Sequence, residues 1–252
     1  MVNTNFLKET EVKKIIERKG KYQVVEYLKD ISVDPASAQN AYFCSAMNVR
    51  KRQAAISLNG DDVIVQAGAM QWMTGNIEAG TDIKGVGDLA RKFLGSKVTG
   101  ESAVKPRYHG SGMLVLEPTY KHMIIENLAD WNGGMVIEDG LFLACDGGVD
   151  MRVVMRDTLS SAALGNEGLF NTSLRGSGYV LLESPVPYDE LVIIDLDNDV
   201  LKIDGSYAIA WSESLKFTVE RTTKTLIGSA ASGEGLVNVY RGSGRVLMAP
   251  IR

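Results

Sequence analysis

The sequence predicts an all-β protein, a repeated β-sandwich or barrel with one short helix at its amino terminus. Three observations lead to this prediction. Short runs rich in β-branched and aromatic residues, bounded by Gly, Asn, Asp or Pro, recur along the chain after Gly20. No helical pattern alternates with these runs. The tripeptide Gly-Ser-Gly also returns at a constant interval.

The amino-terminal segment differs from the rest of the chain. In residues 6–18 the apolar positions recur at roughly helical spacing, with Glu and Lys between them, which predicts a short amphipathic helix. We therefore separate residues 1–20, a helical extension, from residues 21–252, the β body. A second short helix is predicted at residues 87–94, inside a glycine-rich insert at residues 80–98.

The predicted strands follow one another through the β body. Each is a run of four to seven residues next to turn-forming Gly, Asn, Asp or Pro. In chain order these runs are YQVVEYL, AYFCSAM, AISL, DVIVQ, GMLVL, GYVLL, ELVII and RVLMA.

Gly-Ser-Gly occurs at residues 110–112, 176–178 and 242–244, so that successive copies stand 66 residues apart. Each copy precedes a strand-like run, MLVLEP, YVLLES or RVLMAP. A tight hairpin turn with a positive φ angle is the interpretation that we favour for each tripeptide.

This repeat predicts three modules, at about residues 60–118, 135–184 and 201–250. One such module is too small to bury its own apolar face, so the modules are expected to pack against one another. The insert at residues 80–98 belongs to the first module, and insertions of this kind usually mark one face of a repeat protein.

Composition and charge exclude several classes of protein. An apolar content of 45% with 23% charged residues is that of a folded globular chain. A net charge of −4 makes a protein that coats nucleic acid improbable. Because the chain shows neither a secretion signal nor an apolar run that could span a bilayer, a cytoplasmic location is expected. Cys44 and Cys145 are expected to be small core residues.

Two groups of cations are candidate anion contacts. His109, Arg175 and Arg241 each stand directly before a Gly-Ser-Gly tripeptide, whose backbone N–H groups could form a nest around an anion. Arg50, Lys51 and Arg52 form the densest basic run of the chain, which could contact phosphate groups; a solvated strand or turn explains the run equally well.

Patterns that would support catalysis, a metal or a cofactor are incomplete. GVGDLA at residues 85–90 matches a relaxed dinucleotide fingerprint, but no convincing strand enters it. The run DLDNDVLKIDGS resembles the start of a calcium loop, yet it has Val200 and Ser206 where glycine and glutamate are needed; a hairpin is the better interpretation. With two histidines and no nucleophile elbow, the sequence predicts no enzyme, cofactor or metal site.

Seven segments, taken in order, resemble the AIM24 family, also called the DUF124 family. They are AGAMQWMTGNIE (67–78), GSGMLVLEP (110–118), MVIEDGLFLAC (135–145), GNEGLF (165–170), GSGYVLLES (176–184), LKIDGSYAIAW (201–211) and GEGLVNVYRGSGRVLMAP (233–250). The resemblance covers roughly residues 21–252 and leaves the amino-terminal helical stretch outside the common pattern.

The resemblance implies a fold similar to the tryptophan RNA-binding attenuation protein, TRAP, of the double-stranded β-helix type. It implies a ring-like homo-oligomer, with a trimer favoured, in which neighbouring subunits cover the edge strands. Mitochondrial relatives are associated with organising the inner membrane, and the family pattern contains no catalytic residues.

Three functional hypotheses follow. The first is a non-enzymatic oligomeric scaffold or assembly protein, with protein partners. The second is a nucleic-acid or small-ligand binder that uses grooves between subunits, with the basic run at residues 50–52, Arg175 and Arg241 as phosphate contacts. The third is a membrane-peripheral protein anchored by the predicted helix at residues 6–18.

Overall fold

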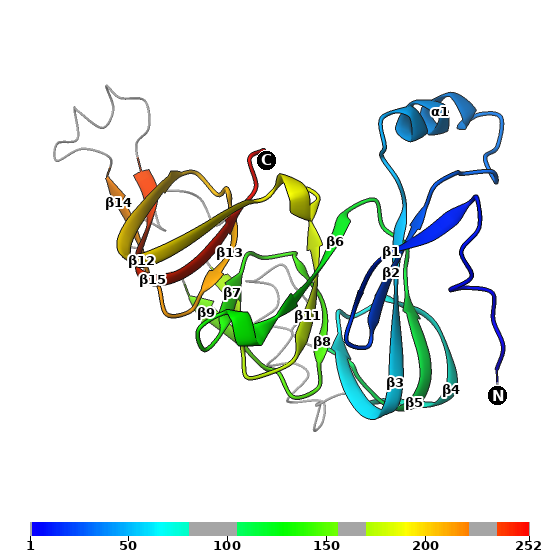
Figure 1. Cartoon of the computed structure of the whole chain (residues 1–252), viewed down its shortest axis with the longest axis horizontal. Helices are drawn as coiled ribbons and strands as arrows, with labels where there is room; N and C mark the ends of the chain where they lie inside the picture. The colour runs from blue at the N-terminus through cyan, green and yellow to red at the C-terminus, as the bar shows by residue number, and fades with distance from the viewer. Residues whose placement is uncertain (1, 81–104, 156–169, 222–235, 252) are drawn as a thin grey trace, which may run out of the picture.

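The computed structural model describes residues 2–80, 105–155, 170–221 and 236–251. The described chain consists of two curled antiparallel sheets and one short α-helix, which confirms the predicted all-β class (Figure 1). A fold of this kind follows from the many short β-branched runs, each of which can bury one face against a neighbouring sheet.

The first sheet has eight strands. Its path is β1 (Lys13–Lys19), β2 (Tyr22–Tyr27), β3 (Arg52–Val65), β8 (Phe142–Asp146), β11 (Tyr179–Ser184) and β6 (His122–Asn127); β4 (Met70–Gly80) pairs with β5 (Arg107–Leu116), which pairs with β3.

The second sheet has seven strands. Its path is β12 (Val192–Asp204), β15 (Leu236–Met248), β13 (Ala208–Ser212), β7 (Met135–Ile137), β10 (Phe170–Arg175) and β9 (Asp150–Met155); β14 (Lys216–Arg221) also pairs with β15.

The strands fall into three sets with the same pairing, which we call module 1 (β3–β5), module 2 (β6–β11) and module 3 (β12–β15). In each set a central strand lies between two others: β5 between β3 and β4, β11 between β6 and β8, and β15 between β12 and β13. Module 2 gives strands to both sheets and so joins them, with modules 1 and 3 at opposite ends of the molecule (Figure 1). The domain boundaries expected from the sequence stay a prediction.

One backbone hydrogen bond recurs in all three modules. The N–H groups of Glu117, Glu183 and Ala249 donate to carbonyl oxygens just after the module's turn glycine, at 2.7, 2.7 and 2.8 Å. The donors stand 66 residues apart, as the Gly-Ser-Gly tripeptides do. The sequence interval therefore corresponds to a repeated structural position.

None of the three Gly-Ser-Gly tripeptides is a hairpin turn between paired strands, which corrects the interpretation made from the sequence. Residues 110–112 lie within β5 and residues 242–244 within β15; residues 176–178 connect β10 to β11. In β5 the glycines allow a close approach of backbones: a Cβ atom on Gly112 would stand 1.9 Å from the carbonyl oxygen of Thr74. The supposed hairpin at DLDND is likewise part of β12, which pairs continuously with β15 across a bulge.

The amino-terminal helix predicted at residues 6–18 is wrong. Lys13–Lys19 forms strand β1, which pairs with β2 across a turn at Gly20, whose φ is +55°. Pairing with the largely buried strand β2 outweighs the weak helical periodicity of the segment. The membrane anchor proposed for this helix loses its basis.

The α-helix of the described chain is instead α1 (Ala38–Ala46), where the sequence analysis predicted a strand. Alanine and glutamine favour a helix, and Asp34 accepts hydrogen bonds from the N–H groups of Ala36 and Ser37 just before it. Cys44 lies on this helix and is half-buried, so it is not the core residue expected, whereas Cys145 is buried. The helix predicted at residues 87–94 and residues 81–98 of the insert lie outside the described residues.

Candidate functional site

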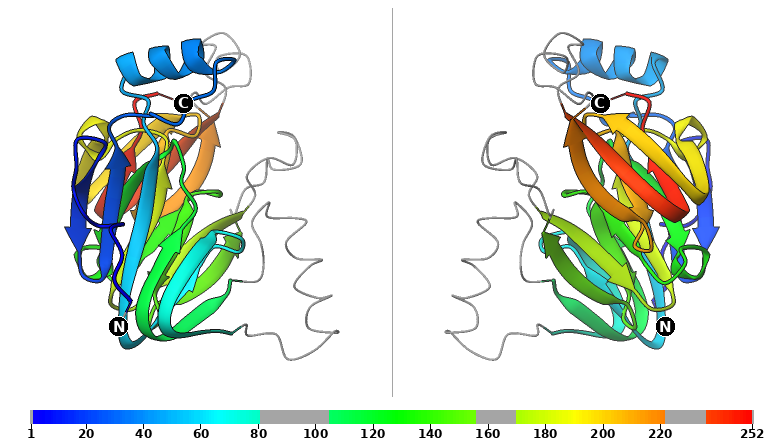
Figure 2. Two further views of the ribbon diagram at one scale, coloured as in Figure 1. Left: turned by 90° about the vertical axis from the view of Figure 1, so that its right-hand side faces the viewer. Right: turned by 90° about the vertical axis from the view of Figure 1, so that its left-hand side faces the viewer.

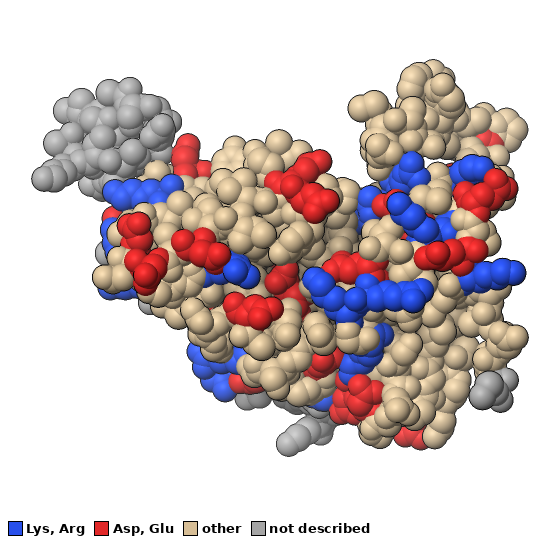
Figure 3. Space-filling model, viewed as in Figure 1, with Lys and Arg blue, Asp and Glu red and all other residues tan. Residues whose placement is uncertain are grey.

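The largest described hollow is a groove of about 1190 Å³, which we call the long groove. It lies between β1, the stretch before β3, and the turn that contains η2 (Tyr188–Glu190). Figure 3 shows Lys and Arg side chains over β1 and β2, with Asp and Glu among them. The acidic and basic residues that line the groove are Lys14, Glu17, Lys19, Glu26, Arg50, Arg52, His122, Asp189 and Glu190. Its charge is therefore mixed.

The structure places the basic run at residues 50–52 beside this groove. Each of its three cations, however, already contacts an acceptor group of the protein itself. Arg50 donates to the carbonyl oxygen of Leu28 at 3.1 Å. Lys51 pairs with Asp30 at 2.7 Å, and this contact raises the pKa of Lys51. Arg52 is buried and pairs with Glu26 at 2.9 Å. The run therefore serves the packing of β2 and β3.

The other three predicted anion contacts are also paired with carboxylates. His109 contacts Asp62. This contact is the chief reason why the carboxyl pKa of Asp62 is lowered. Arg175 makes a two-pronged pair with Glu213. Arg241 makes another with Glu220, where it lowers the carboxyl pKa of Glu220 to about 2.

The structure does not gather these residues into one site. His109 lies on β5, Arg175 on β10 and Arg241 on β15, and the basic run belongs to the stretch around the start of β3. Their carboxylate partners are Asp62 on β3, Glu213 in the turn after β13, and Glu220 on β14. Anion binding by these six residues stays a prediction.

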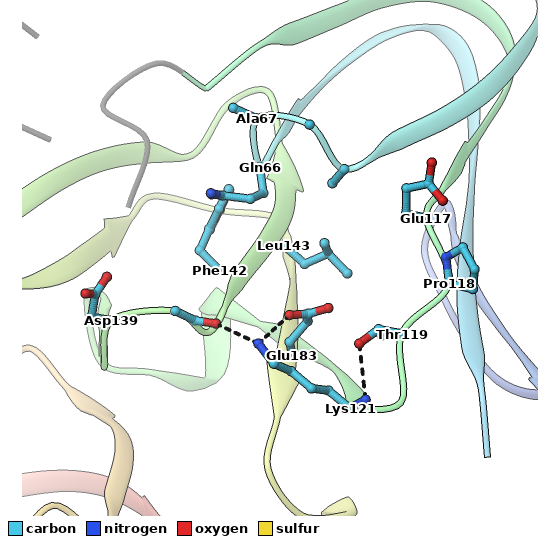
Figure 4. A pocket seen from close by; sticks show the side chains of 13 residues that line it. Gln66, Ala67, Glu117, Pro118, Thr119, Lys121, Asp139, Phe142, Leu143 and Glu183 are labelled. Carbon is cyan, nitrogen blue, oxygen red and sulfur yellow. Dashed lines mark hydrogen bonds and ion pairs between the residues drawn. The ribbon is translucent and has the colours of Figure 1, made fainter. Parts of the chain in front are cut away.

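A second cavity, of about 490 Å³, lies where modules 1 and 2 meet; we call it the junction pocket (Figure 4). Gln66 and Glu117 come from module 1, and Asp139, Phe142 and Glu183 from module 2, so that polar groups surround an apolar floor. A cavity of this size and lining fits a small polar molecule.

The junction pocket is built from repeated positions. Glu117 and Glu183 stand at the same place at the end of the central strand of their modules, and Ala249 takes this place in module 3. Lys121 reaches across the pocket, with its Nζ 2.7 Å from a carboxylate oxygen of Glu183 (Figure 4). The sequence signal for this pocket was the glutamate after two of the three tripeptides, which the sequence analysis did not use.

A buried acid lies between the two sheets and was also missed. Glu126 on β6 is buried, and the indole N–H of Trp131 donates to its carboxylate at 3.1 Å. Burial raises the pKa of Glu126, against the lowering effect of that hydrogen bond and of the charges of Lys19 and Arg245. An isolated glutamate inside an apolar run gave no such signal in the sequence.

This raised pKa predicts a pH-dependent stability. The folded chain binds the proton of Glu126 more tightly than the unfolded chain does. The stability that this proton contributes is therefore complete below the unfolded pKa of about 4.3 and lost as the pH rises through the folded pKa.

Glu126→Gln should raise the urea midpoint at pH 7 relative to the native chain, and the two midpoints should converge near pH 4. Glu78→Gln, at an exposed position on β4, is the control that should show no such gain. A Glu126→Gln effect equal at both pH values would contradict this account.

Clusters of metal ligands and membrane-spanning helices were also sought in the described residues. Among residues 2–80, 105–155, 170–221 and 236–251, no three His, Cys, Asp or Glu side chains are grouped so that they could hold a metal ion. The helices in the same ranges include none that is both long and apolar enough to cross a membrane.

Comparisons with known proteins give one family and one fold. A family model described as mitochondrial biogenesis AIM24 matches residues 47–251. An uncharacterised protein of Streptococcus pyogenes serotype M6 is 30% identical over 195 residues, which cover 75% of this chain and 76% of that protein. A crystal structure of a Streptococcus pyogenes protein superposes with a TM-score of 0.59 at 23% identity, over 95% of this chain and 94% of the other, and so has a similar fold.

Proposed function

This chain belongs to the AIM24 family, and from that premise we propose that it is a non-enzymatic, oligomeric scaffold or assembly protein. The homo-oligomer expected for the family is part of the proposal, with a trimer favoured. The likeness to TRAP and the cytoplasmic location stay predictions. What supports the proposal best is the surface of helix α1.

Helix α1 has nine residues, and none of them is buried. Tyr42, Phe43 and Met47 are 70%, 56% and 75% exposed. Isolated helices shorter than about 12 residues are marginal in water, so a helix of this length normally depends on packing. The helix stands away from the sheets (Figures 1 and 2).

The chemistry of this surface is that of a protein contact. Residues 35–49 contain no charged side chain. The rings of Tyr42 and Phe43 meet edge to face, with centroids 5.6 Å apart. Aromatic residues and Met, together with few charges, characterise the centre of protein interfaces. Helix α1 therefore supports a role in which the scaffold presents this helix to a protein partner.

The direct test of the proposed function is the mass of the purified protein in solution. Light scattering should give a defined multiple of 27.4 kDa, with three chains as the favoured number. A single-chain mass at every concentration, or robust turnover of a metabolite, would contradict the proposal.

A paired substitution on α1 tests whether the helix is a contact surface rather than part of the core. Tyr42→Ser together with Phe43→Ser should change the free energy of unfolding by about 0.5 kcal/mol or less, as surface changes do. Binding of a hydrophobic fluorescent dye to the folded protein should fall. Phe6→Ser is the matched control, because Phe6 is buried and packs on Trp72, and it should lower the unfolding midpoint. A loss of stability as large as that of the control would place α1 in the folding core instead.

A further inference from the structure

The three modules are joined by one kind of strand pairing, used twice. At the first joint, residues 63–65 of β3 pair antiparallel with residues 144–146 of β8. At the second, β7 pairs in the same way with residues 210–212 of β13. In both cases the strand that ends just before a module's turn glycine is added to the strand that follows the turn glycine of the next module.

The same hydrogen bond closes both joints. The N–H of Gln66 donates to the carbonyl oxygen of Leu143 at 2.8 Å, and that of Glu138 donates to the carbonyl oxygen of Ile209 at 3.0 Å. Both acceptors lie at a break in register where one strand has an extra residue, a β-bulge. A bulge of this kind re-aims the backbone, here toward the incoming strand.

Strand β4 carries the same bulge without an incoming strand. Its pairing with β5 shifts register between Met70 and Trp72, which leaves Gln71 at the position of Leu143 and Ile209. Within the described ranges β4 pairs with β5 alone. Module 1 therefore offers a preformed acceptor edge that modules 2 and 3 use internally.

Strand β12 carries the complementary, donor edge. Tyr108, Leu174 and Tyr240 stand 66 residues apart, and their pairing partners are Val63 on β3, Met135 on β7 and Leu201 on β12. Residues 201–203 thus match the two segments that make the internal joints. Where the chain is described, β12 pairs with β15 alone, so this edge is open.

Both open edges carry exposed apolar side chains. Met73 on β4 is 39% exposed, and Val200 on β12 is 46% exposed. In the internal joints the residues at the position of Met73, which are Cys145 on β8 and Trp211 on β13, are 0% and 3% exposed. Unprotected edges are normally covered or paired.

We propose that β12 of one copy adds to β4 of a second copy and repeats the internal joint between chains. The predicted register pairs Leu201 with Thr74, Lys202 with Met73, and Ile203 with Trp72. The N–H of Asp204 then donates to the carbonyl oxygen of Gln71 in the second copy. This inference rests on the proposed oligomeric scaffold and names its interface.

A second copy is the occupant because this chain's own edges match each other and cannot meet. β4 and β12 lie at opposite ends of the long axis (Figure 1). One subunit therefore gives its β12 edge and receives through its β4 edge. Such a head-to-tail contact closes into a ring if the rotation between copies allows it and otherwise grows into a filament.

Two proline variants test the contact, one on each edge. In an antiparallel strand, alternate N–H groups point to opposite neighbours, which directs those of Lys202 and Met73 to the open edges. Lys202→Pro and Met73→Pro each remove one of these donors, and proline is tolerated at such edge positions. Each should raise the dissociation constant of self-association on the order of tenfold or more, measured by light scattering over a dilution series.

Mixing the two variants separates this contact from any other. Lys202→Pro keeps an intact β4 edge, and Met73→Pro keeps an intact β12 edge. Each alone should be a single chain, whereas an equimolar mixture should form a pair of chains and nothing larger. If the native protein associates but both variants associate as strongly, the edge contact is wrong and the proposed scaffold stands. A native protein that stays a single chain overturns both.

Charge variants guard against misfolding of the proline variants, which circular dichroism would reveal. Met73→Lys places a second ammonium opposite Lys202 and should weaken association about threefold. Adding Lys202→Glu to Met73→Lys should restore native association. A double variant no stronger than Met73→Lys would contradict the predicted register.

Discussion

Replacing Gly110 by alanine should lower the free energy of unfolding on the order of 4 kcal/mol, a large effect for a single methyl group. Gly110 lies within β5 with a φ of +133°. A Cβ atom there would stand 2.0 Å from the carbonyl oxygen of Asn76 on β4. Since that oxygen belongs to backbone, β4 would have to move away from β5.

Gly242→Ala is the matched control, because Gly242 takes the same place in the third tripeptide. Its φ of +119° is also unfavourable for alanine, but the nearest atom to a Cβ there is 3.8 Å away. We expect a loss of about 1–2 kcal/mol from the backbone conformation alone. Urea unfolding of both variants measures the difference. Equal losses would mean that the close approach of β4 and β5 contributes nothing.

Trp131→Ala should lower the free energy of unfolding by about 3–5 kcal/mol, as expected when a large buried side chain is removed. Trp131 is 0% exposed and packs in the core between the two sheets. Its loss would also remove the hydrogen bond that its indole donates to buried Glu126. Both effects act in the same direction.

Trp72→Ala is the control for Trp131→Ala. Trp72 is half-buried on β4 and contacts Phe6 edge to face, with ring centroids 5.5 Å apart. Because it buries less area, its removal should cost about 1–3 kcal/mol. Denaturant midpoints for the two variants, measured at one pH, compare the two losses of stability. A cost for Trp131→Ala no greater than that for Trp72→Ala would contradict the central place of Trp131 in the core.

Strands were predicted correctly where the runs are rich in β-branched residues. The prediction failed where pairing with another strand determines the conformation of a segment. AISL and all but the last residue of DVIVQ lie in β3, and all but the last residue of RVLMA form the end of β15, as expected. The segment at residues 6–18 has a weak helical period, and only its pairing with β2 makes part of it a strand. Gly20 lies in the turn between β1 and β2, whereas the glycines within β5 allow the close approach of β4, which depends on the tertiary fold.

The candidate contacts were less predictable because their partners lie far away in sequence. Arg175 meets Glu213 in the turn after β13, and Arg52 meets Glu26 across the β2–β3 pair. A run of cations therefore says nothing by itself about which carboxylates neutralise it. The open edges of β4 and β12 could not be seen before the pairing of all three modules was known.

The most direct test of self-assembly through the strand edges is an engineered disulfide between copies. Leu201 and Thr74 are predicted to face each other at a pair where antiparallel side chains lie closest. Thr74→Cys with Leu201→Cys, in a chain that carries Cys44→Ser, should cross-link into multimers on mild oxidation. Thr74→Cys with Lys202→Cys places the thiols on opposite faces and should not. Multimers linked through residues 74 and 201, found by peptide mapping, are the predicted result; a chain that stays single, or links equally in the control, would contradict it.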